Sequence, residues 1–351
     1  MRASLKLLSM FLVFSLQGCN LWDYLKPPTR EPAPPEGSRI EAQELLYSYL
    51  NSRVAGENTE NLRAYLTEEA WNDYRSSKLS LESNSNKEIV GYKILDQADL
   101  SNGRFAFTVS LQMTDRTEPL AENIIEDLIV TFNNDEYRVS SARFLESTII
   151  KGEAGELIWM KTSVEGKQNE GKIFNLQEFP AQMVPIGGTS GQEFGVGKDG
   201  YSTVILNPES QGLAFGTSGA HCAVALLNWE GKNSLPEKVK LTPIDLLYGG
   251  RARLLAFSPD SQYLMVESTT PAGTERVFVY QTDVRNKLNF NLDQDFPVEV
   301  YNINFSRWEV NSQSILIRIT PGPDQTRVDQ GKLGTWVIKV ESGKREKVIG
   351  E

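Results

Sequence analysis

The stretch Phe257-Ser-Pro-Asp-Ser-Gln-Tyr-Leu264 decides the fold of the second half of the chain. A large apolar residue leads into a Pro-Asp turn, and an apolar run follows the turn. Proline presets φ for a turn and aspartate bonds its own backbone, so the stretch predicts two strands joined by a tight turn. The pattern occurs three times without gaps, starting at Asn207, Ser258 and Glu309, a spacing of 51 residues.

Each copy is followed by another predicted strand and a further turn, so one unit is about 50 residues long. The aligned copies are Asn207-Pro-Glu-Ser-Gln-Gly-Leu213, Ser258-Pro-Asp-Ser-Gln-Tyr-Leu264 and Glu309-Val-Asn-Ser-Gln-Ser-Ile315. A fainter first unit is expected between residues 145 and 176. Units of this length are typical of stacked four-stranded sheets. Residues 149–351 are therefore predicted to form an all-β, propeller-like repeat domain of three to four units.

The stretch Phe257–Leu264 resembles the F-S-P-D-G-x-x-L hallmark of TolB-like and WD40-like β-propeller repeats, with Ser261 where glycine is usual. The other copies have Glu209 in place of the aspartate or Val310 in place of the proline. The resemblance implies a small propeller, an incomplete one, or an open β assembly completed by the preceding domain. A β-sandwich with coincidental repeats is the alternative.

Residues 38–148 are predicted to form a separate α+β domain. The hydrophobic period favours helices over 39–54 and 59–66, and a third helix capped by Thr67. The period then changes to two, which predicts strands over 89–95, 105–113, 125–132 and 137–144, with a hairpin turn at 133–135. Helices followed by an antiparallel meander predict a curved sheet wrapped around a helix.

The order of these elements, with RVAGENTENLRAYLTEEAW at 53–71, resembles NTF2-like or cystatin-like domains of bacterial surface lipoproteins. In NTF2-like enzymes the cone is lined by acid/base residues that commonly include histidine, and this stretch contains none. Tyr47, Trp71 and Tyr74 are candidates for lining a small-molecule pocket in the cone. Packing in the hydrophobic core is the favoured interpretation of all three.

The N-terminus carries an export pattern. Arg2 and Lys6 precede the apolar stretch 7–16, which is too short to span about 30 Å of hydrocarbon, so residues 1–18 are predicted to be a signal peptide. Leu16-Gln-Gly-Cys19 resembles the bacterial lipobox, and the resemblance implies that Cys19 is acylated and becomes the mature N-terminus. Residues 19–37 contain five prolines and are predicted to be an extended, lipid-anchored linker. An ordinary secreted protein is the alternative.

Acylated Cys19 would attach the protein to the lipid bilayer on the extracytoplasmic face of the cell membrane. Asn20 follows the cysteine instead of aspartate, so the retention signal of some diderm bacteria is absent and an outer-membrane location is compatible. A formal net charge of −10 without clustered lysine and arginine argues against nucleic acid as a partner. A protein or a cell-envelope polymer is the expected partner.

The residue pattern predicts no catalytic, cofactor-binding or metal site. The only histidine, His221, is adjacent to Cys222 ahead of a strand, where neighbouring side chains point to opposite faces and do not form a dyad. Gly195-Val-Gly-Lys-Asp-Gly200 has the letters of a dinucleotide motif but continues as a strand, not a helix. Asn291-Leu-Asp-Gln-Asp295 lacks the glycine of a calcium loop.

The predicted function is that of a non-enzymatic lipoprotein that binds a protein or an envelope polymer. A small-molecule-binding or sensory lipoprotein that uses the NTF2-like cone is the main alternative. A glycan-active hydrolase with two acidic residues on the β region is a third.

Overall fold

The computed structural model describes residues 38–56, 59–76, 86–100, 102–133, 136–166, 168–186, 192–231 and 235–348. The predicted signal peptide, Cys19, the linker at 19–37 and the hairpin turn at 134–135 lie outside the described residues. Residues 36–351 form one compact unit. It is mostly β, with several antiparallel sheets and few helices. None of its described helices is long and apolar enough to cross a lipid bilayer.

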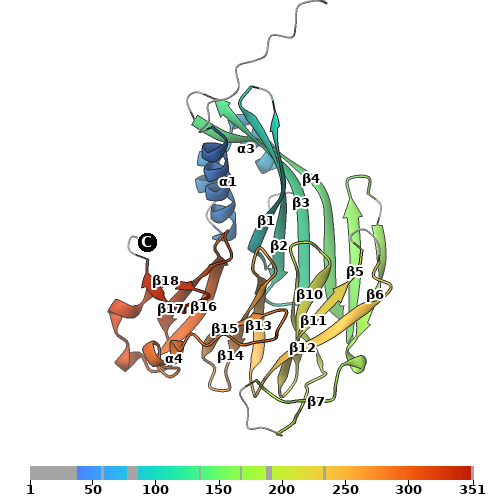
Figure 1. The fold of residues 1–351 in the computed structure, drawn as a ribbon, viewed down its shortest axis with the longest axis vertical. Coiled ribbons are helices and arrows are strands. Elements are labelled where there is room, and N and C mark those ends of the chain that lie inside the picture. The colour runs from blue at the N-terminus through green and yellow to red at the C-terminus, as the bar shows by residue number, and fades with distance from the viewer. Residues whose placement is uncertain are drawn as a thin grey trace, which may run out of the picture. The chain divides into compact units, whose positions relative to one another are not determined.

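Short helices precede a six-stranded antiparallel meander with the strand order β1-β2-β3-β4-β5-β6 (Figure 1). The helices are α1 (Ser38–Val54), α2 (Thr59–Leu62), η1 (Arg63–Tyr65) and α3 (Glu68–Ser76). The strands are β1 (Lys87–Leu100), β2 (Arg104–Asp115), β3 (Leu120–Asn133), β4 (Glu136–Glu153), β5 (Glu156–Ser163) and β6 (Gln168–Asn175). The three predicted helices and four predicted strands are confirmed, and the strands extend further than their hydrophobic periods indicated.

Helix α1 packs its apolar face on the sheet. Ala42, Leu46 and Leu50 are fully buried at helical spacing, and α1 contacts β1, β3 and β4. The predicted cap of α3 is present, because the Thr67 hydroxyl accepts a hydrogen bond from the Ala70 amide at 3.2 Å. A hydrophobic core therefore fills the space between the helices and the first four strands.

Strand β4 joins residues 38–148 to residues 149–351, which were predicted to be separate domains. The predicted boundary between residues 148 and 149 falls inside this strand, which pairs with β3 on one side and β5 on the other. The strands expected as a fainter first repeat unit, at 145–176, are the second half of β4 with β5 and β6. They belong to the same sheet as β1–β3 and pack against β9–β11 through a second core.

Three further antiparallel sheets follow, and all three copies of the repeat lie in them. The first is β9 (Gly200–Leu206), β10 (Gly212–Ser218), β11 (Cys222–Trp229) and β12 (Val239–Leu247). The second is β13 (Arg251–Phe257), β14 (Tyr263–Thr269) and β15 (Glu275–Gln281). The third is β16 (Tyr301–Trp308), β17 (Ser314–Pro321), β18 (Gly334–Lys339) and β19 (Arg345–Lys347). Strands β7 (Gln182–Met183) and β8 (Phe194–Gly195) form a separate pair, and α4 (Leu292–Asp295) is a short helix.

The turns of the three copies have the same geometry. Ser210, Ser261 and Ser312 occupy the same repeat position with φ of 54°, 62° and 59°. In each copy the amide of the serine donates to the carbonyl three residues earlier, at 2.8–3.0 Å. A left-handed backbone conformation favours glycine. This explains why the F-S-P-D-G-x-x-L pattern has glycine where this chain has Ser261.

The sheets contact one another in chain order. Strand β9 lies against β2, β3 and β4, β13 against β9 and β10, and β16 against β15. Strand β16 also contacts β1, so the series of contacts returns to the sheet where it began. The series of repeat sheets therefore contacts the six-stranded sheet at both of its ends, through β9 and through β16.

Polar side chains of β2 and β3 make the contact with the unpaired edge of β9. Gln112 donates to the Leu206 carbonyl at 2.9 Å and Thr114 donates to the Val204 carbonyl at 3.1 Å. Ser110 donates to the Pro208 carbonyl at 3.0 Å. Residues 110, 112 and 114 alternate along β2, so they share one face of the sheet, while the apolar residues between them face the helices. These contacts satisfy buried carbonyls that no neighbouring strand reaches.

Substitution of Gln112 by alanine is expected to destabilise the fold by about 1–3 kcal/mol, because the buried Leu206 carbonyl loses its donor. Gln97→Ala on β1 is the matched control, since Gln97 is exposed, and its effect should stay within about 0.5 kcal/mol. The measurement is the denaturant midpoint of each variant. We call the contacts of β2 and β3 with the edge of β9 the seam. Equal midpoints for the two variants would show that the seam contributes no stability.

Candidate functional site

The three repeat turns lie side by side and are joined by side-chain hydrogen bonds. The Ser261 hydroxyl donates to Glu209 Oε2 at 2.9 Å, and the Asp260 amide donates to Ser312 Oγ at 3.2 Å. Asn123 of β3 donates to Ser210 Oγ at 2.7 Å, which joins the first turn to the six-stranded sheet. We call the surface formed by residues 207–211, 258–262 and 309–313 the turn face.

A cavity of about 320 Å³ lies where the turn face meets α1 and β1. It is lined by Tyr47, Tyr92, Lys93, Ile94, Pro259, Asp260, Val310, Asn311 and Ser312. The lining residues come from one helix, one strand and two repeat turns, so the cavity exists only where the two regions of the chain are assembled. This convergence makes it the candidate functional site.

The charged groups of the cavity are held by neighbours. Lys93 forms an ion pair with Glu209 of the first turn. Asp260 Oδ1 accepts from the Ser258 hydroxyl at 2.6 Å and from the Gln262 amide at 3.1 Å. These bonds fix the turn and leave the cavity with one acidic group and several hydrogen-bonding groups on a rigid frame.

Two tyrosines form the aromatic wall of the cavity. The Tyr92 hydroxyl donates to Asn51 Oδ1 at 3.1 Å, and Gln43 donates to the Tyr47 hydroxyl at 3.0 Å. Burial raises the pKa of Tyr92 above its ordinary value, so its phenol stays protonated at neutral pH. The wall is therefore uncharged and suited to packing and hydrogen bonding.

The structure separates the three aromatic residues that were candidates for a pocket in the cone. Tyr47 lines the cavity at the turn face, but Trp71 and Tyr74 do not. Trp71 is buried in the core between the helices and the sheet, and its ring is stacked on Tyr74 at 6.2 Å with an interplanar angle of 13°. The favoured interpretation as core residues therefore describes Trp71 well, and Tyr47 and Tyr74 are partly buried and pack against the same core.

His221 and Cys222 lie in different environments. Cys222 is buried, and burial raises the pKa of its thiol, which disfavours the reactive thiolate. The His221 ring instead stacks on exposed Tyr248 at 4.5 Å, and its Nδ1 accepts from the Gly249 amide at 3.0 Å. Neither contact places an imidazole nitrogen on the sulfur.

Among the described residues, no cluster of three or more His, Cys, Asp or Glu side chains could hold a metal ion. In the segment considered as a calcium loop, the carboxylates form ion pairs with arginines. Asp293 pairs with Arg276 at 3.1 Å, and Asp295 pairs with Arg345. The glycine-rich segment at 195–200 leads into strand β9, as the sequence predicted.

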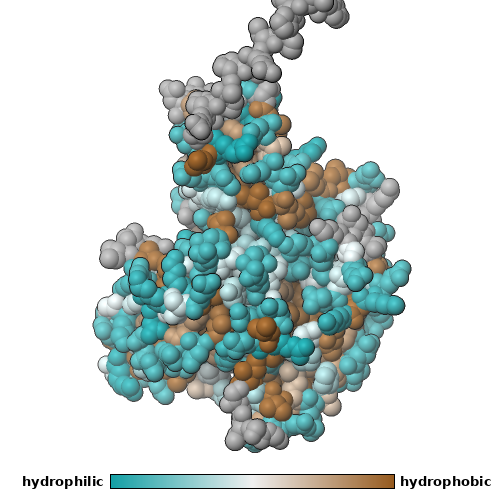
Figure 2. All heavy atoms as spheres, viewed as in Figure 1, coloured by the Kyte–Doolittle hydropathy of each residue, from teal (hydrophilic) through white to brown (hydrophobic). Residues whose placement is uncertain are grey.

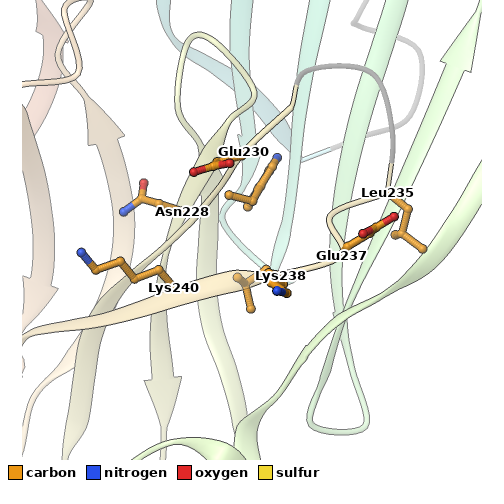
Figure 3. A pocket seen from close by; sticks show the side chains of 8 residues that line it. Asn228, Glu230, Leu235, Glu237, Lys238 and Lys240 are labelled. Atoms are coloured by element: carbon orange, nitrogen blue, oxygen red, sulfur yellow. The ribbon is translucent and has the colours of Figure 1, made fainter.

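A larger cavity of about 750 Å³ lies at the β11–β12 hairpin (Figure 3). Its described lining comes from residues 228–230, 235 and 237–240, and it combines Glu230 and Glu237 with Lys238 and Lys240. Figure 3 shows these side chains spread along the hairpin instead of converging on one point. Unlike the cavity at the turn face, its lining is confined to one hairpin.

The surface visible in Figure 2 is mostly hydrophilic, with hydrophobic residues scattered singly and in small groups. Large side chains that are at least half exposed include Ile40, Val164, Tyr248 and Val284. Scattered exposure of this kind is normal for a folded protein and does not by itself mark a site.

A buried carboxylate ties three sheets together near the central strands. Glu267 of β14 is fully buried, and its Oε1 accepts from Arg116 at 2.9 Å. Its Oε2 accepts from the Phe305 amide on β16 at 2.8 Å. Arg116 follows β2, so one carboxylate joins the six-stranded sheet to the second and third repeat sheets. Burial raises the pKa of Glu267, and Arg116 opposes the shift.

The sequence did not predict that Lys93 and Asp260 line one cavity or that Glu267 links three sheets. Asp260 was expected to act in its turn alone, and its spatial neighbours come from copies of the repeat 51 residues apart. The one signal available was the repeat itself, because equivalent turns of stacked sheets meet at the same edge.

Comparison with protein-family models and with curated proteins finds no match. Among solved structures, TolB from Acinetobacter baumannii is 8% identical with a TM-score of 0.33; the similarity covers 67% of this chain and 55% of that one. Sqt1 from Chaetomium thermophilum is 13% identical over 70% of each chain, with a TM-score of 0.30. The Cps50 (Swd1) β-propeller domain of Myceliophteria thermophila is 9% identical with a TM-score of 0.26, over 57% of this chain and 63% of that domain. This chain thus spans just over half the length of TolB, and these remote similarities do not place it in a family.

The Glu267–Arg116 pair predicts a pH-dependent stability. Because the pKa of Glu267 is raised above its ordinary value of 4.5, its contribution is fully present below that pH and is lost as the pH rises through the higher value. Arg116→Gln removes the opposing charge and raises this pKa further. The loss of stability relative to the natural chain should therefore grow as the pH rises above the ordinary Glu267 value of 4.5.

The measurement is the denaturant midpoint of both proteins across this range. Glu267→Gln carries no titrating carboxyl at this position, so the gap between Glu267→Gln and the double variant Arg116→Gln/Glu267→Gln should not change with pH through this group. A gap that is constant in the single variant as well would contradict the assignment.

Proposed function

We propose that the chain is an extracytoplasmic lipoprotein, anchored through acylated Cys19, that binds a protein or an envelope polymer and has no enzymatic activity. In this proposal the three repeat sheets form a propeller-like assembly, and the NTF2-like N-terminal region completes it. Residues 38–148 and 149–351 are its two functional regions, held above the membrane by the linker at 19–37.

The observation that carries the binding function is the convergence of α1, β1 and two repeat turns on one cavity. Such a surface is rigid, since its backbone is fixed by repeated hydrogen bonds, and it is polar around an aromatic wall. Binding sites commonly combine an apolar wall with a few fixed polar groups. The same observation supports the second candidate, in which a small molecule occupies the cavity beside Tyr47.

Anchoring predicts that the natural chain, expressed in a bacterial host, fractionates with membranes and begins at an acylated Cys19. Cys19→Ser should leave the membrane fraction, because two acyl chains give durable attachment and the variant carries no acyl chain. Cys222→Ser is the matched control and should remain with the membranes. Intact-mass analysis of the purified proteins checks the acylation, and an unacylated, released natural chain would contradict the anchor.

Binding at the turn face predicts position-dependent crosslinking. A photo-crosslinking amino acid at exposed Asn311 should capture a partner in the native cell, whereas one at exposed Ala272, in the β14–β15 turn, should not. The readout is a discrete crosslinked species of higher mass. Equal capture at both positions, or capture at Ala272 alone, would count against the turn face as the binding surface.

A further inference from the structure

The cavity at the turn face has an unbalanced negative charge. Lys93 is already neutralised by Glu209, so it adds no net charge to the cavity. Asp260 accepts hydrogen bonds only from neutral groups, the Ser258 hydroxyl and the Gln262 amide. Within the described part of the chain, no lysine or arginine forms an ion pair with Asp260. Its carboxylate is exposed at the mouth of the cavity and available to an incoming cation.

Two further carboxylates act on the ring of Tyr263, which follows the second turn. Tyr263 is stacked on Trp308 at 6.1 Å, next to the second turn. The pKa of the Tyr263 phenol is raised, first by burial and then by the charges of Glu341, Asp260 and Asp283. Together they give this side of the turn face a negative potential that attracts cations.

The interior of the cavity suits a long basic side chain. Tyr47 and Tyr92 supply aromatic surface on one side, and Ile94 and Pro259 supply apolar contacts. Lysine and arginine bury their methylene stems along such surface and keep the charged head at a polar group. The Arg307 guanidinium opposes the rise in the pKa of Tyr92 but does not line the cavity.

We infer that the cavity binds a basic side chain, lysine or arginine, from an exposed segment of a partner protein. The inference rests on the proposed binding function and names the chemistry of the partner. The methylene stem packs between Tyr47 and Pro259, and the charged head forms an ion pair with Asp260. A cation beside an aromatic ring gains further attraction from the ring face.

The test uses two acetylated, amidated pentapeptides, Gly-Gly-Lys-Gly-Gly and the same peptide with norleucine in place of lysine. Norleucine keeps the methylene stem and removes the charge. The natural chain should bind the lysine peptide about two- to fivefold more tightly than the norleucine peptide, since an ion pair with an exposed carboxylate contributes a factor of this size. Binding is measured by NMR titration, which detects weak affinities.

Two variants of equal charge locate the effect. Asp260→Asn should abolish the preference for lysine, whereas Glu170→Gln, which removes an exposed acid on β6, should retain it. The thermal midpoint of each variant confirms that it is folded. The absence of a lysine preference in the natural chain, or its equal loss in both variants, would overturn the inference.

Failure of this inference is distinguishable from failure of the proposed function. Capture of a partner at Asn311 that is unaffected by Asp260→Asn would retain the binding face and reject the basic side chain. Tighter binding of a glutamate pentapeptide than of the lysine peptide would reject it as well. Binding of the lysine peptide that depends on Asp260 supports both.

Discussion

Hydrogen bonds from β2 and β3 to the free edge of β9 hold the two regions of this chain together. Gln112 and Thr114 bond the Leu206 and Val204 carbonyls of β9, the edge strand of its sheet, and Ser110 bonds the Pro208 carbonyl in the turn that follows. An unpaired buried carbonyl costs free energy comparable to a lost hydrogen bond, so β9 is stable in the interior only beside this polar face. The polar face in turn could not be buried without β9.

The position of the candidate site follows from this constraint. The bond from Asn123 to Ser210 places the first turn beside the six-stranded sheet, and Glu209 of that turn reaches both Lys93 and Ser261. Each turn is thereby positioned by the one before it. On the other side, Glu267 links the second and third repeat sheets to Arg116. The cavity between α1, β1 and the turns is a product of both connections.

The local structure could be predicted from the sequence, but the contacts between β2, β3 and the edge of β9 could not. The Pro-Asp turn at 258–262 and the spacing of 51 residues predicted the strands of the repeat, because turn chemistry is local. The alternation in β2 between apolar and polar residues normally indicates a face toward solvent. Here the polar residues Ser110, Gln112 and Thr114 are buried against β9, about 90 residues later in the chain. No local pattern separates a solvated polar face from one that bonds a distant strand edge.

The most direct test of this account is the stability of the repeat region without the first sheet. A fragment of residues 199–348 retains every strand of the three repeat sheets and loses the polar face that covers the edge of β9. Circular dichroism and thermal unfolding should show no cooperative transition for this fragment, whereas residues 36–351 should unfold cooperatively. A fragment that folds by itself and unfolds in one sharp transition would contradict the central role of the seam.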